Sequence, residues 1–68
     1  MEHKFNYSVH VETRSGDDVS IVRLFDCELI EEACSFALGC HRSINVRGVS
    51  VVVVSLFDSS EVVRFVSR

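Results

Sequence analysis

A run of four consecutive valines, residues 51–54, limits what this chain can fold into. The run lies within the segment VSVVVVSLFD, residues 49–58, of a chain of 68 residues. Valine is β-branched and favours strands. A strand that is covered on one face alternates apolar and polar residues, but this segment is apolar on both faces. The sequence therefore predicts a strand over residues 49–58 without a polar side.

Three further segments have the pattern of strands. Residues 4–13, KFNYSVHVET, alternate cleanly, which predicts a half-buried strand with His10 on its outward side. Residues 14–18, RSGDD, predict a turn, because Gly16 allows a positive φ and aspartate favours turns. Residues 19–25 predict a second strand that forms a hairpin with the first. Residues 61–68, EVVRFVSR, predict the last strand, joined to residues 49–58 by a tight connection.

Between the two pairs of strands the hydrophobic period changes to that of a helix. Residues 26–43 predict an amphipathic helix that begins at Asp26, whose carboxylate is suited to capping free backbone N–H groups. Acidic residues near its start and Arg42 near its end suit the helix dipole. At 100° per residue, one arc collects the apolar side chains Leu29, Ile30, Ala33, Phe36, Ala37, Cys40 and Ile44.

This order of elements predicts one α+β domain over residues 1–68. The helix joins the second and third strands, so these two strands run in the same direction. Placing the first strand between them makes every neighbouring pair antiparallel. We therefore predict a four-stranded antiparallel sheet of ββαββ order, with spatial order 2-1-3-4 and the helix packed on one face.

One helix covers only one face of such a sheet. Half of the alternating valines therefore lie on the face that the helix leaves exposed to solvent. One set, Val49, Val51, Val53 and Phe57, is able to face the helix, although the sequence leaves open which set does so. The other set then forms an apolar patch of the kind that marks interfaces. We predict that this patch dimerises, sheet against sheet, or docks a partner; it contains Val52, Val54, Leu56, Val62 and Val66.

The bulk composition excludes several classes of function. The net charge is −3, whereas a general nucleic-acid binder needs a basic surface, so we expect no direct contact with nucleic acid. The longest apolar run is far shorter than a membrane span, and the first residues lack the pattern of a signal peptide. Three cysteines, an odd number, fit reduced thiols. We therefore expect a cytoplasmic protein without a membrane contact.

No residue pattern indicates an enzyme, a metal site or a cofactor. Cys27, Cys34 and Cys40 lack the close pairing of zinc ligands, and His41 points about 100° away from its neighbour Cys40 on the predicted helix. Catalysis by a cysteine also needs a positioned base, which no neighbour supplies. A cluster of carboxylates is the remaining candidate site, and it contains Asp26, Glu28, Glu31 and Glu32. It either caps and solubilises the helix or forms an anionic surface that docks on a basic partner.

The segment FDCELIEEACSFALGCHRSINVRGVSVVVVSLFDSSEVVRF, residues 25–65, resembles small proteins of phages and mobile elements, in particular several anti-CRISPR proteins. The likeness lies in a strand that leads into an EEA…FA helix and then into a hairpin with a DSSE turn. Antitoxins of the HicB type share a similar strand–helix segment but lack this ending. The resemblance implies binding to a CRISPR effector complex and blocking of its access to target DNA, with the four carboxylates against basic residues of the effector.

The prediction from the sequence is therefore a non-enzymatic inhibitor of the anti-CRISPR type that binds a protein partner, such as a CRISPR effector subunit, in the host cytoplasm. A small acidic module is able to occupy a basic groove by electrostatic complementarity. The alternative is an antitoxin-like or regulatory small protein that forms a homodimer through its valine-rich sheet face.

Overall fold

The computed structural model describes residues 5–66, which form four strands and one helix. The strands β1 and β2 form the first hairpin, the helix α1 follows, and β3 and β4 form the second hairpin. Their bounds are β1 Tyr7–Ser15, β2 Asp18–Cys27, α1 Ile30–Ser43, β3 Val49–Ser55 and β4 Glu61–Val66.

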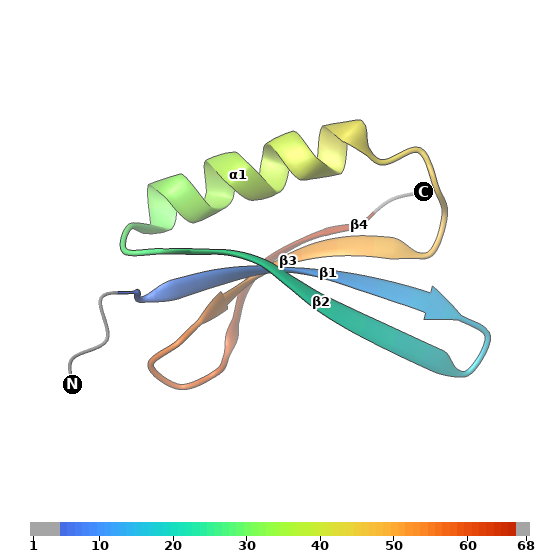
Figure 1. The fold of residues 1–68 in the computed structure, drawn as a ribbon, viewed down its shortest axis with the longest axis horizontal. Coiled ribbons are helices and arrows are strands. Elements are labelled where there is room, and N and C mark those ends of the chain that lie inside the picture. Colours follow the sequence, from blue (N-terminus) through green and yellow to red (C-terminus); the bar gives the residue numbers. More distant parts are fainter. Residues whose placement is uncertain (1–4, 67–68) are drawn as a thin grey trace.

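The sheet has the topology predicted from the sequence. Its strand order is β2-β1-β3-β4, and each of the three neighbouring pairs is antiparallel. The helix α1 lies along one face of this sheet, and the described part of the chain places no element on the other face (Figure 1). We call that other side the open face. The small α+β fold with one covering helix is thus confirmed.

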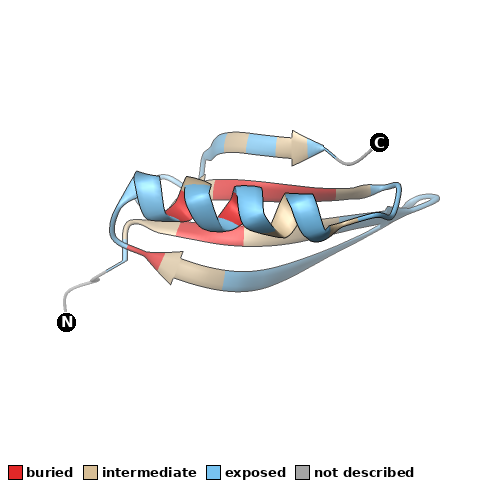
Figure 2. Cartoon of the chain, turned by 90° about the horizontal axis from the view of Figure 1, so that it is seen from above, coloured by how far each residue is buried: buried red, intermediate tan, exposed pale blue. Residues whose placement is uncertain are grey.

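The core lies between α1 and the two central strands. Val51 and Val53 of β3 and Val9 of β1 are fully buried against Ala33 and Ala37 of the helix. Figure 2 shows this buried zone on the two central strands under α1, while the outer part of β2 is exposed. The small side chains of the two alanines allow the helix to pack closely on the sheet. The structure therefore settles which valines face the helix, namely the set that contains Val51 and Val53.

The start of the helix differs from the prediction. The helix begins at Ile30, and Leu29 occupies the cap position without a side-chain hydrogen bond. Asp26, the predicted cap, belongs to β2, which continues to Cys27. The Asp26 carboxylate accepts hydrogen bonds on the open face instead, so the strand pairing of residues 26 and 27 prevails over the capping preference of aspartate.

The strand ends also differ from the predicted bounds. β3 ends at Ser55, and Phe57 lies in the following turn with 77% of its surface exposed, so its predicted place against the helix is wrong. Ser59 has a φ of +61° in the same connection, where the chain reverses direction. β1 extends to Ser15, because a two-residue turn at Gly16, whose φ is +63°, closes the first hairpin. The predicted strand residues Lys4, Ser67 and Arg68 lie outside the described residues.

Candidate functional site

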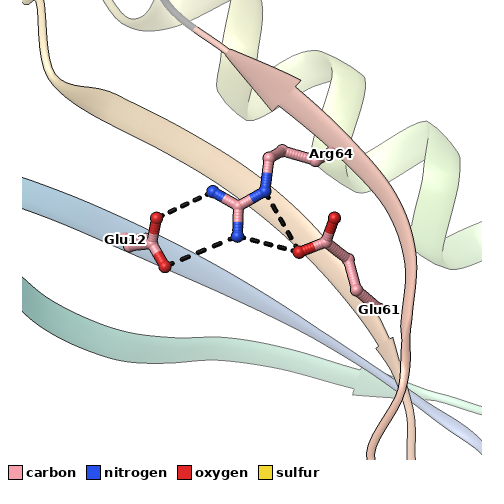
Figure 3. A network of polar contacts seen from close by, with 3 residues as sticks. All are labelled: Glu12, Glu61 and Arg64. Carbon is pink, nitrogen blue, oxygen red and sulfur yellow. Dashed lines mark hydrogen bonds and ion pairs between the residues drawn. The ribbon is translucent and has the colours of Figure 1, made fainter.

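The open face carries a network of ion pairs across β3. Arg64 of β4 donates from Nη1 to Oε2 of Glu12 on β1 at 2.7 Å, and from Nη2 to Oε1 of Glu61 at 2.8 Å. The guanidinium therefore reaches across β3 to the Glu12 carboxylate and also holds the Glu61 carboxylate of its own strand (Figure 3). Beneath it, Val52 is only 5% exposed and Ser50 is buried. A polar layer thus covers the centre of β3.

This layer corrects the prediction of a continuous valine patch. Val52 is paired in register with His10 on one side and Arg64 on the other, so it is covered by longer neighbours on its own face. Leu56 lies beyond the end of β3 and is half-buried. Val62 and Val66 on the edge strand β4 remain exposed, and Val54 is half-buried. The apolar surface of the open face is therefore divided, and the predicted dimer through it stays a prediction.

The ion pairs predict that stability falls in acid. The hydrogen bond from Arg64 holds the pKa of Glu12 below its ordinary value, and the hydrogen bonds from Arg23 and then Ser8 do the same for the pKa of Asp26. A carboxyl with a lowered folded-state pKa contributes stability above its unfolded-state pKa, and this stability is lost as the pH falls through the folded-state pKa.

We therefore expect urea midpoints to decrease from pH 5 toward pH 2, and to decrease less in an Arg64→Met variant. Arg42→Met is the matched control, because Arg42 is an exposed helix residue that makes no ion pair with a described residue. Equal acid sensitivity of wild type and Arg64→Met would show that this network contributes nothing to the pH dependence.

A second polar cluster on the open face joins the first two strands. The Ser8 hydroxyl donates to Oδ1 of Asp26 at 2.8 Å, Arg23 donates to the same oxygen at 2.8 Å, and Nε2 of His10 lies 2.9 Å from the Ser8 oxygen. Serine, histidine and aspartate are the residues of hydrolase triads, but the order here is different. A triad needs the serine hydroxyl to donate its hydrogen bond to histidine, whereas the Ser8 hydroxyl donates its hydrogen bond to the aspartate. Ser8 is also fully buried, and the hydrogen bonds of this cluster link β1 to β2.

The predicted acidic site is divided between the two sides of the sheet. Glu31 and Glu32 occupy the exposed first turn of α1, and Glu28 is exposed just before it. Asp26 lies on the open face and is held by Arg23 and Ser8, so it does not belong to the same surface. We call the three remaining carboxylates, Glu28, Glu31 and Glu32, the glutamate cluster.

The described surface contains an apolar groove that the sequence did not predict. It has a volume of about 780 Å³ and lies between the second half of α1 and the first hairpin. It arises because the hairpin diverges from the helix toward its turn (Figure 1). Its apolar lining includes Val11, Leu24, Phe36, Ile44, Val46 and Val49.

The geometry of the groove depends on an irregularity in β2. The register between β1 and β2 shifts between Val9 and His10, which places Leu24 as an extra residue in β2. Leu24 and Phe25 both reach the helix side, where Phe25 stacks on Phe36 with ring centroids 4.4 Å apart. A bulge of this kind has no signature in residue alternation, and the sequence therefore predicted a strand over residues 19–25 without placing the bulge in it.

Cys27 and His41 are the cysteine and histidine with the most distinctive surroundings among the described residues. Burial, with the nearby carboxylates of Glu32 and Asp26, raises the pKa of the Cys27 thiol, which disfavours the reactive thiolate. The ring of His41 lies against Phe65 with centroids 5.7 Å apart, and its Nδ1 is buried without a hydrogen-bond partner among the described residues. Within residues 5–66, no group of three potential metal ligands comes together.

Comparison with protein-family models, with curated proteins and with solved structures finds no match for this chain. No helix of the described residues has both the length and the apolar character needed to cross a membrane. The candidate site therefore rests on geometry alone, and that geometry is a groove with an apolar lining beside the glutamate cluster.

Proposed function

We propose that this chain is a non-enzymatic inhibitor that binds a protein partner through the apolar groove and the glutamate cluster. The groove is the observation that carries the proposal. Its rim leaves large apolar side chains exposed, including Leu24 at 46% and Val46 at 63%. Exposed apolar surface around a hollow is typical of protein interaction sites, and burying it is the main source of affinity.

The glutamate cluster makes one end of this surface negatively charged. Glu32 lies on the same side of α1 as Phe36, Gly39 and Ser43, which line the groove, because their spacings of four, seven and eleven residues bring them to one stripe. This side of the helix thus has an acidic end, at its start, and an apolar end, where the groove lies along its second half. A partner segment with an apolar side chain followed by basic residues is complementary to both ends.

The class of partner that we propose is a CRISPR effector subunit, as the resemblance of residues 25–65 to anti-CRISPR proteins implies. An effector holds nucleic acid in a positively charged channel. A chain of net charge −3 with an acidic helix end suits that channel, and an inhibitor seated there excludes target DNA by occupying its site.

The test is inhibition of target-DNA binding by purified CRISPR effector complexes. We expect the wild type to lower the fraction of labelled DNA bound, and the Glu28→Lys/Glu31→Lys/Glu32→Lys variant to be at least roughly tenfold weaker, with the wild-type effect decreasing at high salt. Leu24→Asp should weaken inhibition through the groove. The matched control is Val66→Asp, which adds the same charge at an apolar residue of the open face that is 57% exposed.

Three results separate the parts of this proposal. Loss of inhibition in both the glutamate and the Leu24 variants, with Val66→Asp unchanged, supports docking through the groove and its acidic end. Loss of inhibition in the Val66→Asp variant alone would show that the partner binds the open face instead of the groove. No effect of the wild type on any effector would reject the CRISPR partner.

A further inference from the structure

We propose that the exposed edge of β2 pairs antiparallel with β2 of a second copy of this chain, which joins two sheets into one sheet of eight strands. The proposal is independent of the partner proposed above, because it concerns a different surface. It starts from the place of β2 at the edge of the sheet, where no described strand pairs with its outer side.

The outer side of β2 offers free backbone groups in a regular row. In the two-residue hairpin, Ser15 and Asp18 form a hydrogen-bonded pair, and the register continues this pattern at Thr13–Ser20 and Val11–Val22. The N–H and C=O groups of Ser20 and Val22 therefore point toward β1. Those of Val19, Ile21 and Arg23 point outward, where they are ready to pair with another strand.

β2 has a bulge at Leu24, but the stretch before it, from Val19 to Val22, lacks the features that usually protect an exposed strand. Proteins block edges with short strands, prolines, lysines or bulges. β2 is ten residues long, the chain contains no proline, and the stretch from Val19 to Val22 has neither a charge nor a bulge. Three of its four side chains are apolar, and they are exposed on both faces, with Ile21 at 61% and Val22 at 56%.

The opposite edge is better protected, which singles out β2. β4 is six residues long, and its register with β3 shifts between Val53 and Val54. It carries the charged side chains of Glu61, its first residue, and Arg64, which are held in the ion-pair network of Figure 3. A second copy that pairs along β4 has fewer free groups to meet than one that pairs along β2.

Charge complementarity favours a second copy of this chain as the partner of β2 and selects one pairing register between the two strands. A twofold axis through Ser20 places Val19 opposite Ile21 of the other copy and brings Arg23 toward Asp17, the turn residue that precedes β2 of that copy, and each pair occurs twice. Arg23 donates a hydrogen bond from Nε to Oδ1 of Asp26 but its side chain remains 54% exposed, so its Nη donors are free for the second carboxylate. Axes through Ile21 or Val22 lack this ion pair.

The first test is the mass in solution by sedimentation equilibrium. We expect the wild type to have twice the mass of one chain, and Ile21→Lys to be a monomer, because a charge is placed at the centre of the new pairing. Val66→Lys is the matched control and should remain a dimer, since Val66 is a similarly exposed residue of the open face on the other edge strand. Far-UV circular dichroism confirms that both variants are folded.

The second test is a disulfide across the proposed axis. Ser20 faces Ser20 of the second copy in a non-hydrogen-bonded pair, where Cα atoms lie about 4.5 Å apart, a separation that a disulfide spans. In a Cys34→Ala/Cys40→Ala background, Ser20→Cys should give a cross-linked dimer on a non-reducing gel, and Val22→Cys should not. A wild type that stays monomeric at millimolar concentration overturns the proposal, and so does a dimer that Val66→Lys dissociates but Ile21→Lys does not.

Discussion

Replacing Val53 by alanine should lower the free energy of unfolding by about 2–3 kcal/mol, since it removes two buried methyl groups and leaves a cavity under the helix. Val53 is fully buried in the cluster that contains Ala33 and Ala37. A chain of this size has a total stability of only about 3–10 kcal/mol. The melting temperature should therefore fall by roughly 10–20 °C.

The neighbouring residue is the control for this prediction. Val54 belongs to the open face, is half-buried and lines a small polar hollow with His10 and Glu61. Val54→Ala should lower the free energy of unfolding by less than about 1 kcal/mol, because the methyl groups of Val54 are only partly removed from water on folding. Urea denaturation of both variants measures the difference. Equal costs at the two positions would contradict the assignment of alternate valines to opposite faces.

The topology could be predicted because few alternatives satisfy the pattern of the chain. The alternation in β1, the helical period of α1 and the short connections leave an antiparallel sheet with β1 inside as the simplest arrangement. The facing of the valines could not be predicted in this way. Both sets are apolar, and only the contact of Val51 and Val53 with two helix alanines distinguishes them.

The surface could not be predicted to the same degree, because it depends on register. The outward residues His10 and Glu12 are visible in the alternation, but their partners come from distant strands. Glu12 and Arg64 are 52 residues apart in sequence and meet only through the pairing of both strands with β3. The bulge at Leu24 likewise follows from pairing, and with it the position of the groove.

The start of the helix shows that the capping preference of aspartate alone does not determine where a helix begins. Asp26 has the preferred chemistry for a cap, but β2 continues through it, and Ser8 and Arg23 bind its carboxylate. Strand pairing with β1 is a long-range contact that no capping preference anticipates. The consequence for function is large, since it moves one carboxylate of the predicted acidic site to the other side of the sheet.

Two glycines should respond to alanine with opposite signs. Gly48 has a φ of +79°, and a Cβ there would lie 2.9 Å from the backbone oxygen of Arg14. The carbonyl of Gly48 also accepts a hydrogen bond from the Arg14 N–H at 2.8 Å, so the loop before β3 is tied to the end of β1. Left-handed backbone alone costs a non-glycine residue about 1–2 kcal/mol. With the clash between this Cβ and the Arg14 oxygen added, Gly48→Ala should lower the free energy of unfolding by at least about 2 kcal/mol.

Gly39 is the matched position, because it lies inside α1 and a Cβ there meets nothing within 4 Å. Gly39→Ala should raise the free energy of unfolding by about 0.5–1 kcal/mol, since alanine loses less backbone freedom than glycine in a helix. Urea denaturation of the two variants under one condition measures both signs. A neutral Gly48→Ala would mean that the loop is free to move away from β1, and β3 would then lack a fixed start beside the groove.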